Sequence, residues 1–262
     1  MRRLLTIDCG GARLGASLDL ASGTTGLLFV TGGSQTRIGS HRLFERLAAA
    51  LAGDGTPCFR FDRRGIGDSE GEDGGWRSSG PDITAATATF RRECPSLERI
   101  VGIGLCDGAT ALALFGADAG VDGLILLNPW LVETRPGELP AAAIRRHYQE
   151  RLTTPAGLRK ILFGSVSWKK ALTGIRKMAL PENRALSDEA AQALRRHAGH
   201  IEAILASDDE TAIAAERELA RPVFDGVLTR APAKLPTGSH TFARPADLER
   251  LRAAVEAALA RL

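Results

Sequence analysis

The chain has 262 residues, of which 44% are hydrophobic and 25% are charged, a size and composition typical of one large α/β domain with a modest insertion. Its net charge of +3 comes without a block of Lys and Arg interleaved with aromatic residues, so no nucleic-acid partner is indicated. No stretch approaches the ~18 consecutive apolar residues of a membrane-spanning helix. Asp8 and Arg13 interrupt any apolar region of a signal peptide, so a cytoplasmic protein is expected.

Cysteine usage is consistent with a reducing compartment. The four cysteines, Cys9, Cys58, Cys94 and Cys106, show no paired spacing typical of metal ligands, and disulfides are not expected. The sequence implies neither a metal nor an organic cofactor.

Short apolar runs alternate with helical patterns along most of the chain, beginning with a hairpin at Gly10-Gly11. Strands are predicted at 4–8, 13–20, 26–30, 57–62, 100–105, 123–127 and 201–206, with edge pieces at 224–228 and 233–235. Helices are predicted at 41–52, 82–94, 109–115 and 246–262, with one more reaching about residue 220. Strand–helix units of this kind predict right-handed crossovers and a mostly parallel central sheet flanked by helices.

The pattern changes after Pro129. Residues 130–200 are rich in Arg and Lys and predict mostly helices with proline breaks. Because 70 residues are long for one crossover, we expect a helical cap at 130–200, inserted into a core made of 1–129 and 201–262. Ordinary crossover helices are the alternative.

The most informative stretch joins the predicted strand 100–105 to the predicted helix 109–115. It reads Gly104-Leu105-Cys106-Asp107-Gly108, which has the form of the nucleophile elbow of α/β-hydrolases with Cys in place of the usual Ser. Side chains two positions either side of the nucleophile would collide in so sharp a turn, which explains both glycines. The helix N-terminus favours a thiolate. A buried structural cysteine is the alternative interpretation.

An activated cysteine needs a base, and the base needs a group that orients it. The α/β-hydrolase order of nucleophile, acid and histidine is met by Cys106, an acidic pair after the strand 201–206, and His240. His240 lies in a short loop before the terminal helix and is the candidate base. Asp209 is the preferred acid, because Asp208 lies closer to the strand and could cap the next helix. Asp208 stays the alternative acid.

Acyl transfer also needs N–H donors for the developing oxyanion. The first candidate is the backbone N–H of Asp107, which follows the nucleophile. The second is expected from Gly33 or Ser34, in the loop after the strand 26–30.

Two further stretches are less specific. Arg37 and His41 follow the oxyanion loop and could bind an anionic or sugar-like group, although a plain surface role fits equally well. The stretch 60–69 carries the pattern D-x-R-G-x-G-x-S. We interpret it as architectural, with glycines for the turn and an Asp/Arg pair that holds the loop.

Four stretches together, 32–42, 60–71, 104–109 and 238–242, resemble the exosortase A system-associated hydrolases, the first of their two types. The resemblance covers most of the chain and is weakest in the predicted cap. It implies an α/β-hydrolase encoded with exopolysaccharide and exosortase genes in Gram-negative bacteria, with an undefined substrate. This sequence departs from the pattern at Asp208-Asp209, where a single aspartate followed by an apolar residue is expected.

The predicted function is cleavage of an ester, thioester or related acyl bond in a small or acylated substrate through Cys106, His240 and Asp209. One alternative is an acyltransferase with the same residues, because thioesters also react with amines and alcohols. The other is a non-catalytic ligand-binding member of the fold, in which the Cys106 thiol would react no faster than the other three.

Overall fold

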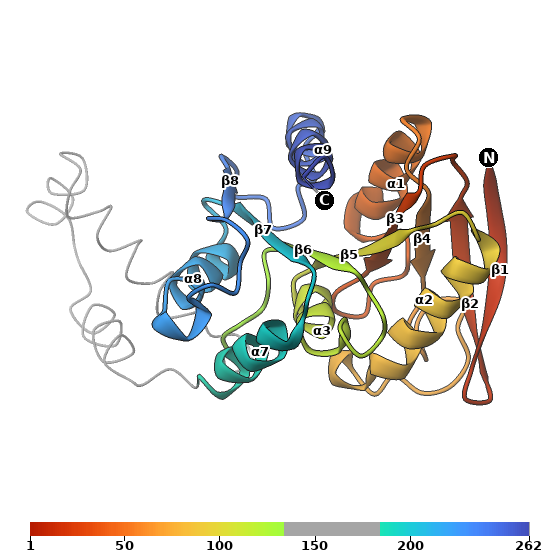
Figure 1. The fold of residues 1–262 in the computed structure, drawn as a ribbon, viewed down its shortest axis with the longest axis horizontal. Helices are drawn as coiled ribbons and strands as arrows, with labels where there is room; N and C mark the ends of the chain where they lie inside the picture. Colours follow the sequence, from red (N-terminus) through yellow and green to blue (C-terminus); the bar gives the residue numbers. More distant parts are fainter. Residues whose placement is uncertain (134–183, 262) are drawn as a thin grey trace, which may run out of the picture.

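The computed structural model describes residues 1–133 and 184–261. In this part of the chain one eight-stranded sheet runs through the molecule in the order β1-β2-β4-β3-β5-β6-β7-β8 (Figure 1). The strands are β1 (Arg2–Cys9), β2 (Ala12–Asp19), β3 (Thr25–Val30), β4 (Cys58–Phe61), β5 (Arg99–Leu105), β6 (Gly123–Leu127), β7 (His200–Ala206) and β8 (Ala233–Leu235). The pairs β1–β2 and β2–β4 are antiparallel, and all pairs from β4 to β8 are parallel.

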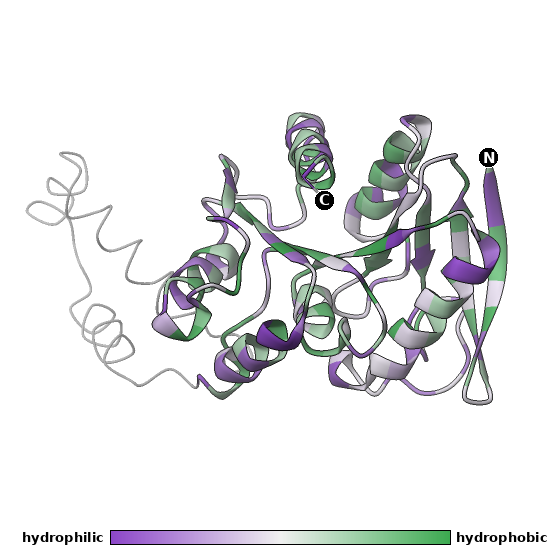
Figure 2. Cartoon of the chain, viewed as in Figure 1, coloured by the Kyte–Doolittle hydropathy of each residue, from purple (hydrophilic) through white to green (hydrophobic). Residues whose placement is uncertain are grey.

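The central strands are continuous apolar runs that are buried along almost their whole length, as expected of parallel strands covered on both faces. The hydrophobic colouring in Figure 2 runs along these strands. The register places Gly104, near the end of β5, between Val30 of β3 and Leu126 of β6. The residue after β5 therefore emerges at the carboxyl edge of the sheet, between two neighbouring strand ends.

Helices cover both faces of the sheet. They are α1 (Leu43–Gly53), α2 (Gly80–Glu93), α3 (Asp107–Phe115), α7 (Ala185–Arg196), α8 (Glu210–Leu219) and α9 (Pro245–Leu259). The helices α1 and α9 lie together on one face, whereas α2, α3 and α7 lie on the other (Figure 1). A Cβ at Gly102 would lie 2.8 Å from Leu112 Cδ2, so this glycine lets α3 pack closely on β5.

The predicted elements are confirmed within a few residues at their ends, with one exception. The predicted edge strand at 224–228 is wrong, because Pro222–Phe224 forms a short 3-10 helix and the chain then turns. Pro222 supplies the fixed φ of a helix start, and Gly226 adopts a φ of 71° that a strand does not use. Phe224 is still buried, because the turn packs it into the core.

Most of the predicted cap, residues 134–183, lies outside the described residues, so the cap stays a prediction. Its last part includes α7, which packs on α3. The side chains of Leu186 and Leu194 in this helix are buried. None of the helices within 1–133 and 184–261 is both long and apolar enough to cross a membrane.

Candidate active site

The turn between β5 and α3 is as sharp as the glycine pattern predicts. Cys106 adopts φ 59° and ψ −124°, a backbone conformation that costs a non-glycine residue about 1–3 kcal/mol. A Cβ at Gly104 would lie 2.7 Å from the amide nitrogen of Ala109, and one at Gly108 would lie 2.5 Å from the carbonyl oxygen of Val30. Both glycines are therefore required by the close approach of the backbone on either side of Cys106.

Cys106 differs from the other cysteines in its surroundings. It is half-buried, whereas Cys9, Cys58 and Cys94 are buried. Burial raises the pKa of each of these three thiols. Cys106 is thus the cysteine that a reagent in solvent reaches most readily.

The late loop brings His240 to Cys106. The imidazole Nδ1 lies 2.9 Å from the Asp209 Oδ2, and the ring also interacts with the Cys106 side chain. The structure therefore brings together one residue from the elbow, one from the end of β7 and one from the loop before α9. Their chain order and contacts are those of a nucleophile, a base and an orienting acid.

The pKa of His240 is strongly perturbed. Burial would lower it, but the hydrogen bonds with Asp209 and Cys106 and the negative charges of both raise the pKa to about 10. The imidazolium is accordingly the favoured form of His240 near neutral pH, where it interacts with both the Asp209 carboxylate and the Cys106 side chain.

Asp209 also caps α8. Its Oδ2 accepts a hydrogen bond from the backbone N–H of Ala212 at 2.9 Å, and Asp209 is the N-cap residue of the helix. The sequence interpretation gave the cap to Asp208, and this part is wrong. Asp208 instead has its backbone N–H bonded to the Thr237 carbonyl, whereas one carboxylate, that of Asp209, both caps the helix and holds His240.

The loop after β3 lies against the elbow. A Cβ at Gly32 would lie 2.5 Å from the Leu105 carbonyl oxygen and 3.2 Å from Cys106 Cβ, so only glycine fits there. Gly33 and Ser34 follow as exposed residues of the same turn. The Gly33 N–H donates to Asp107 Oδ1 at 2.6 Å. The sequence interpretation missed this interaction, because it considered only the backbone of Asp107.

Arg37 has its guanidinium engaged elsewhere. Its Nε donates to Ser17 Oγ at 3.0 Å, its Nη2 to Asp68 Oδ2 at 2.7 Å and its Nη1 to the buried carboxylate of Asp62. Arg37 therefore anchors the loop after β4, and a role for it in substrate binding stays a prediction. His41 is exposed, with a φ of 52°, and its role in substrate binding stays a prediction.

The D-x-R-G-x-G-x-S stretch is architectural, as predicted. Asp62 is fully buried and accepts from the backbone N–H groups of Arg37 at 2.5 Å and Asp68 at 3.0 Å. The Arg64 side chain pairs with Asp82 at 3.1 Å. The aspartate and the arginine of the motif thus hold different partners, and between them they fasten the loop to the turn before α1 and to α2.

The pattern of this chain matches the model of one known family, the alpha/beta hydrolase family, over residues 27–260. The chain belongs to the alpha/beta hydrolase family. No curated protein matches it.

Solved structures of this α/β-hydrolase's fold include several esterases and hydrolases. An esterase from Pyrococcus furiosus is 14% identical with a TM-score of 0.67, over 100% of this chain and 91% of that one. Est1E from Butyrivibrio proteoclasticus, solved with ferulic acid bound, is 16% identical with a TM-score of 0.64, over 98% of each chain. A dienelactone hydrolase from Anabaena variabilis is 14% identical with a TM-score of 0.63, over 97% of this chain and 94% of that one. At such identities the likeness concerns the fold alone.

Asn128 supports the site of this α/β-hydrolase and was missed from sequence. It is fully buried directly after β6. Its Nδ2 donates to the His240 carbonyl oxygen at 2.9 Å, and its Oδ1 accepts from the Ala206 N–H at 2.8 Å. This one side chain therefore ties the end of β7 to the loop that carries His240. The available signal was a polar residue, followed by Pro129, at the end of a buried strand.

We expect Asn128→Ala to lower the free energy of unfolding by about 2–5 kcal/mol, because the buried Ala206 N–H and the part-buried His240 carbonyl lose their partner. It is also expected to slow alkylation of Cys106 severalfold, because the His240 loop loses its tether. Urea unfolding and iodoacetamide labelling measure the two effects. Ser207→Ala is the matched control, since Ser207 Oγ bonds the Leu235 carbonyl at the same sheet edge. A control that slows labelling as much as Asn128→Ala would contradict the tether.

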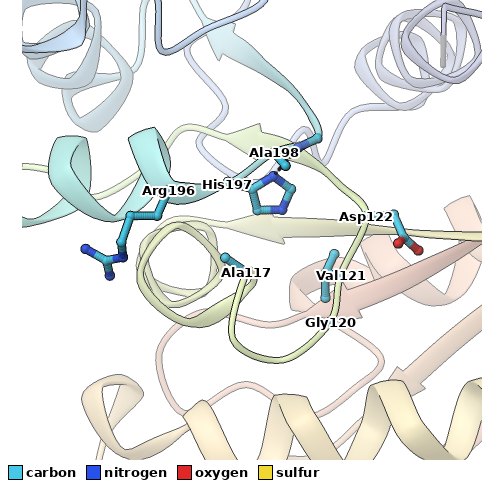
Figure 3. A pocket seen from close by; sticks show the side chains of 8 residues that line it. Ala117, Gly120, Val121, Asp122, Arg196, His197 and Ala198 are labelled. Atoms are coloured by element: carbon cyan, nitrogen blue, oxygen red, sulfur yellow. Dashed lines mark hydrogen bonds between the residues drawn. The ribbon is translucent and has the colours of Figure 1, made fainter.

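A pocket of about 420 Å³ lies away from this site. It is formed by the turns before β6 and β7, at the amino edge of the sheet, and is lined by residues 117, 120–122 and 196–199 (Figure 3). Burial lowers the pKa of His197, whose Nδ1 accepts from the Gly199 N–H at 3.0 Å. No Cys, Ser or Thr is among the residues that line this pocket.

Proposed function

We propose that this α/β-hydrolase cleaves an ester, thioester or related acyl bond with Cys106 as nucleophile, His240 as proton carrier and Asp209 as the residue that orients His240. The observation that carries the proposal is the His240 imidazole, which contacts the Cys106 side chain and the Asp209 carboxylate at once. A strained, half-buried cysteine at a strand-to-helix turn supports it.

In the first half-reaction, the Cys106 thiolate attacks the carbonyl carbon, and a new C–S bond forms as the carbonyl electrons move to oxygen. The oxyanion is held by the N–H of Asp107 and by an N–H of the Gly33–Ser34 turn. When the intermediate collapses, the leaving group departs with its bonding electrons and takes the proton of the His240 imidazolium. Cys106 is left as a thioester of the acyl group.

In the second half-reaction, His240 must act as a base. Acylation removes the negative charge and the hydrogen bond that Cys106 contributes to the raised pKa of His240, so the neutral imidazole becomes accessible. It takes a proton from water, the hydroxide adds to the thioester, and the thiolate leaves as the carboxylic acid is released. The loss of the Cys106 interaction on acylation thus lets His240 change from an acid in the first half-reaction to a base in the second.

The resemblance to the exosortase A system-associated hydrolases supports a substrate linked to exopolysaccharide or exosortase systems. The proposed substrate is a small acylated molecule. Est1E, a protein of the same fold, was solved with ferulic acid, which is a small carboxylic acid. The predicted cap at 130–200 would set the choice among acyl groups.

The test is the pH dependence of Cys106 alkylation by iodoacetamide, followed by mass spectrometry, in the wild type and in His240→Ala. An ordinary thiol near pKa 8.5 is only about 0.3% ionised at pH 6. We expect wild-type Cys106 to react at pH 6 at least about tenfold faster than Cys106 of the variant, because the imidazolium stabilises the thiolate. The three buried cysteines serve as controls within each sample. Equal rates and equal pH profiles in the wild type and in His240→Ala would contradict the proposed triad and favour a non-catalytic binding protein.

A further inference from the structure

The side chain of Asp107 is turned into the place where the proposed oxyanion would lie. Its Oδ1 accepts from the Gly33 N–H at 2.6 Å. The point at which a Gly32 Cβ would stand lies 2.6 Å from the same oxygen and 3.2 Å from Cys106 Cβ. The carboxylate and the nucleophile therefore flank one glycine, and the carboxylate already uses one of the two candidate donors.

The groups around this carboxylate form a cradle for an anion. Burial raises the pKa of Asp107, and this is opposed by the Gly33 N–H, the Arg63 charge and the N–H groups of Gly108 and of Asp107 itself. Arg63 is 4% exposed, and its Nη2 donates to the Gly33 carbonyl, which fixes the turn that carries the donor. Donors that converge on a negative oxygen beside a nucleophile are what an oxyanion site requires.

We propose that the Asp107 carboxylate is a built-in occupant of the oxyanion site, which must withdraw before an acyl substrate can be attacked. The inference rests on the proposed function, because it presupposes a tetrahedral oxyanion at Cys106. One N–H cannot donate a strong, linear hydrogen bond to two acceptors at once. A carboxylate and an oxyanion would also repel each other in the same site. The side chain is thus a positioning residue that holds the site closed.

A purely structural role for Asp107 is the competing explanation, since an acidic residue in the first turn of a helix is favourable. Two reagents that attack the same sulfur separate the explanations. Acylation of Cys106 by p-nitrophenyl acetate passes through an oxyanion, whereas alkylation by iodoacetamide displaces iodide and does not. The ratio of the two rate constants cancels any change in the amount of thiolate.

The experiment measures this ratio in the wild type, Asp107→Ala, Asp107→Asn and a matched control, Asp118→Asn. Asp118 is an exposed carboxylate in the turn after α3. We expect the ratio to rise about 10- to 100-fold in Asp107→Ala, because one oxyanion donor is worth about 100- to 1000-fold in rate. The ratio is expected to rise less in Asp107→Asn, because the amide oxygen of the new side chain can still accept from the Gly33 N–H. The control ratio stays at the wild-type value.

Each outcome decides a different point. A ratio that is unchanged or lower in both Asp107 variants, while acylation is still measurable, overturns the occupant role and leaves the proposed function standing. Acylation that appears only after Asp107 is replaced supports the occupant role most directly. Acylation in none of the proteins, with alkylation intact, overturns the proposed acyl chemistry and this inference with it. Thermal unfolding of each variant checks that all compared proteins are folded.

Discussion

Replacing Cys106 with Ala is expected to reduce turnover of p-nitrophenyl acetate by about 10⁴- to 10⁶-fold, the usual effect of removing a nucleophile from a catalytic triad. Its physical basis is that Cys106 is the proposed nucleophile and that an alanine side chain has no atom that can attack a carbonyl carbon. The fold should survive, because Cys106 is half-buried and Ala keeps the same backbone strain. The free energy of unfolding is expected to change by less than about 1 kcal/mol. Steady-state turnover and urea unfolding measure the two effects.

Cys94→Ala is the matched control, because it removes a thiol that is buried and lies outside the site. It is expected to keep full turnover and to lose about 1 kcal/mol of stability through the cavity. Cys106→Ser adds a second comparison. A serine hydroxyl is not ionised beside His240, so we expect turnover between those of the wild type and the alanine variant. Turnover above about a tenth of the wild type in Cys106→Ala would show that another group carries the chemistry.

The parts of the site that sequence reasoning finds are those encoded locally. The elbow is a single pentapeptide whose two glycines are each explained by a backbone contact within a few ångströms. His240 is found by its chain order and its loop before α9. The strands are found because their apolar runs are continuous and their ends carry Gly, Pro or Asp.

The parts that sequence reasoning misses depend on the register of distant elements. Asn128 acts across β7 on the His240 loop, and Arg37 is held by three residues from two other segments. Asp107 is assigned by sequence only through its backbone, although its side chain reaches Gly33, 74 residues earlier. None of these pairings leaves a local pattern, because each requires the sheet order to be known.

The double role of Asp209 has a testable consequence for turnover. Asp209→Asn is expected to lower kcat by about 10³- to 10⁴-fold, because an amide in place of the carboxylate no longer holds the imidazolium in its orientation. Asn is as good an N-cap as Asp, so α8 should be kept. Asp208→Asn removes the neighbouring charge, and its kcat is expected to stay within about threefold of that of the wild type. The opposite ranking of the two variants would make Asp208 the orienting acid.

The same substitution is expected to change how stability depends on pH. The pKa of His240 is raised from 6.5 to about 10 in the folded protein, so its contribution to stability is fully present below about pH 6.5 and is lost as pH rises through about 10. Asp209 supplies the largest of the interactions that raise this pKa. The stability difference between the wild type and Asp209→Asn should therefore be larger at pH 6 than at pH 10 in urea unfolding. A difference that does not change with pH would mean that Asp209 stabilises the fold only as the cap of α8, and that the ion pair with His240 contributes nothing measurable.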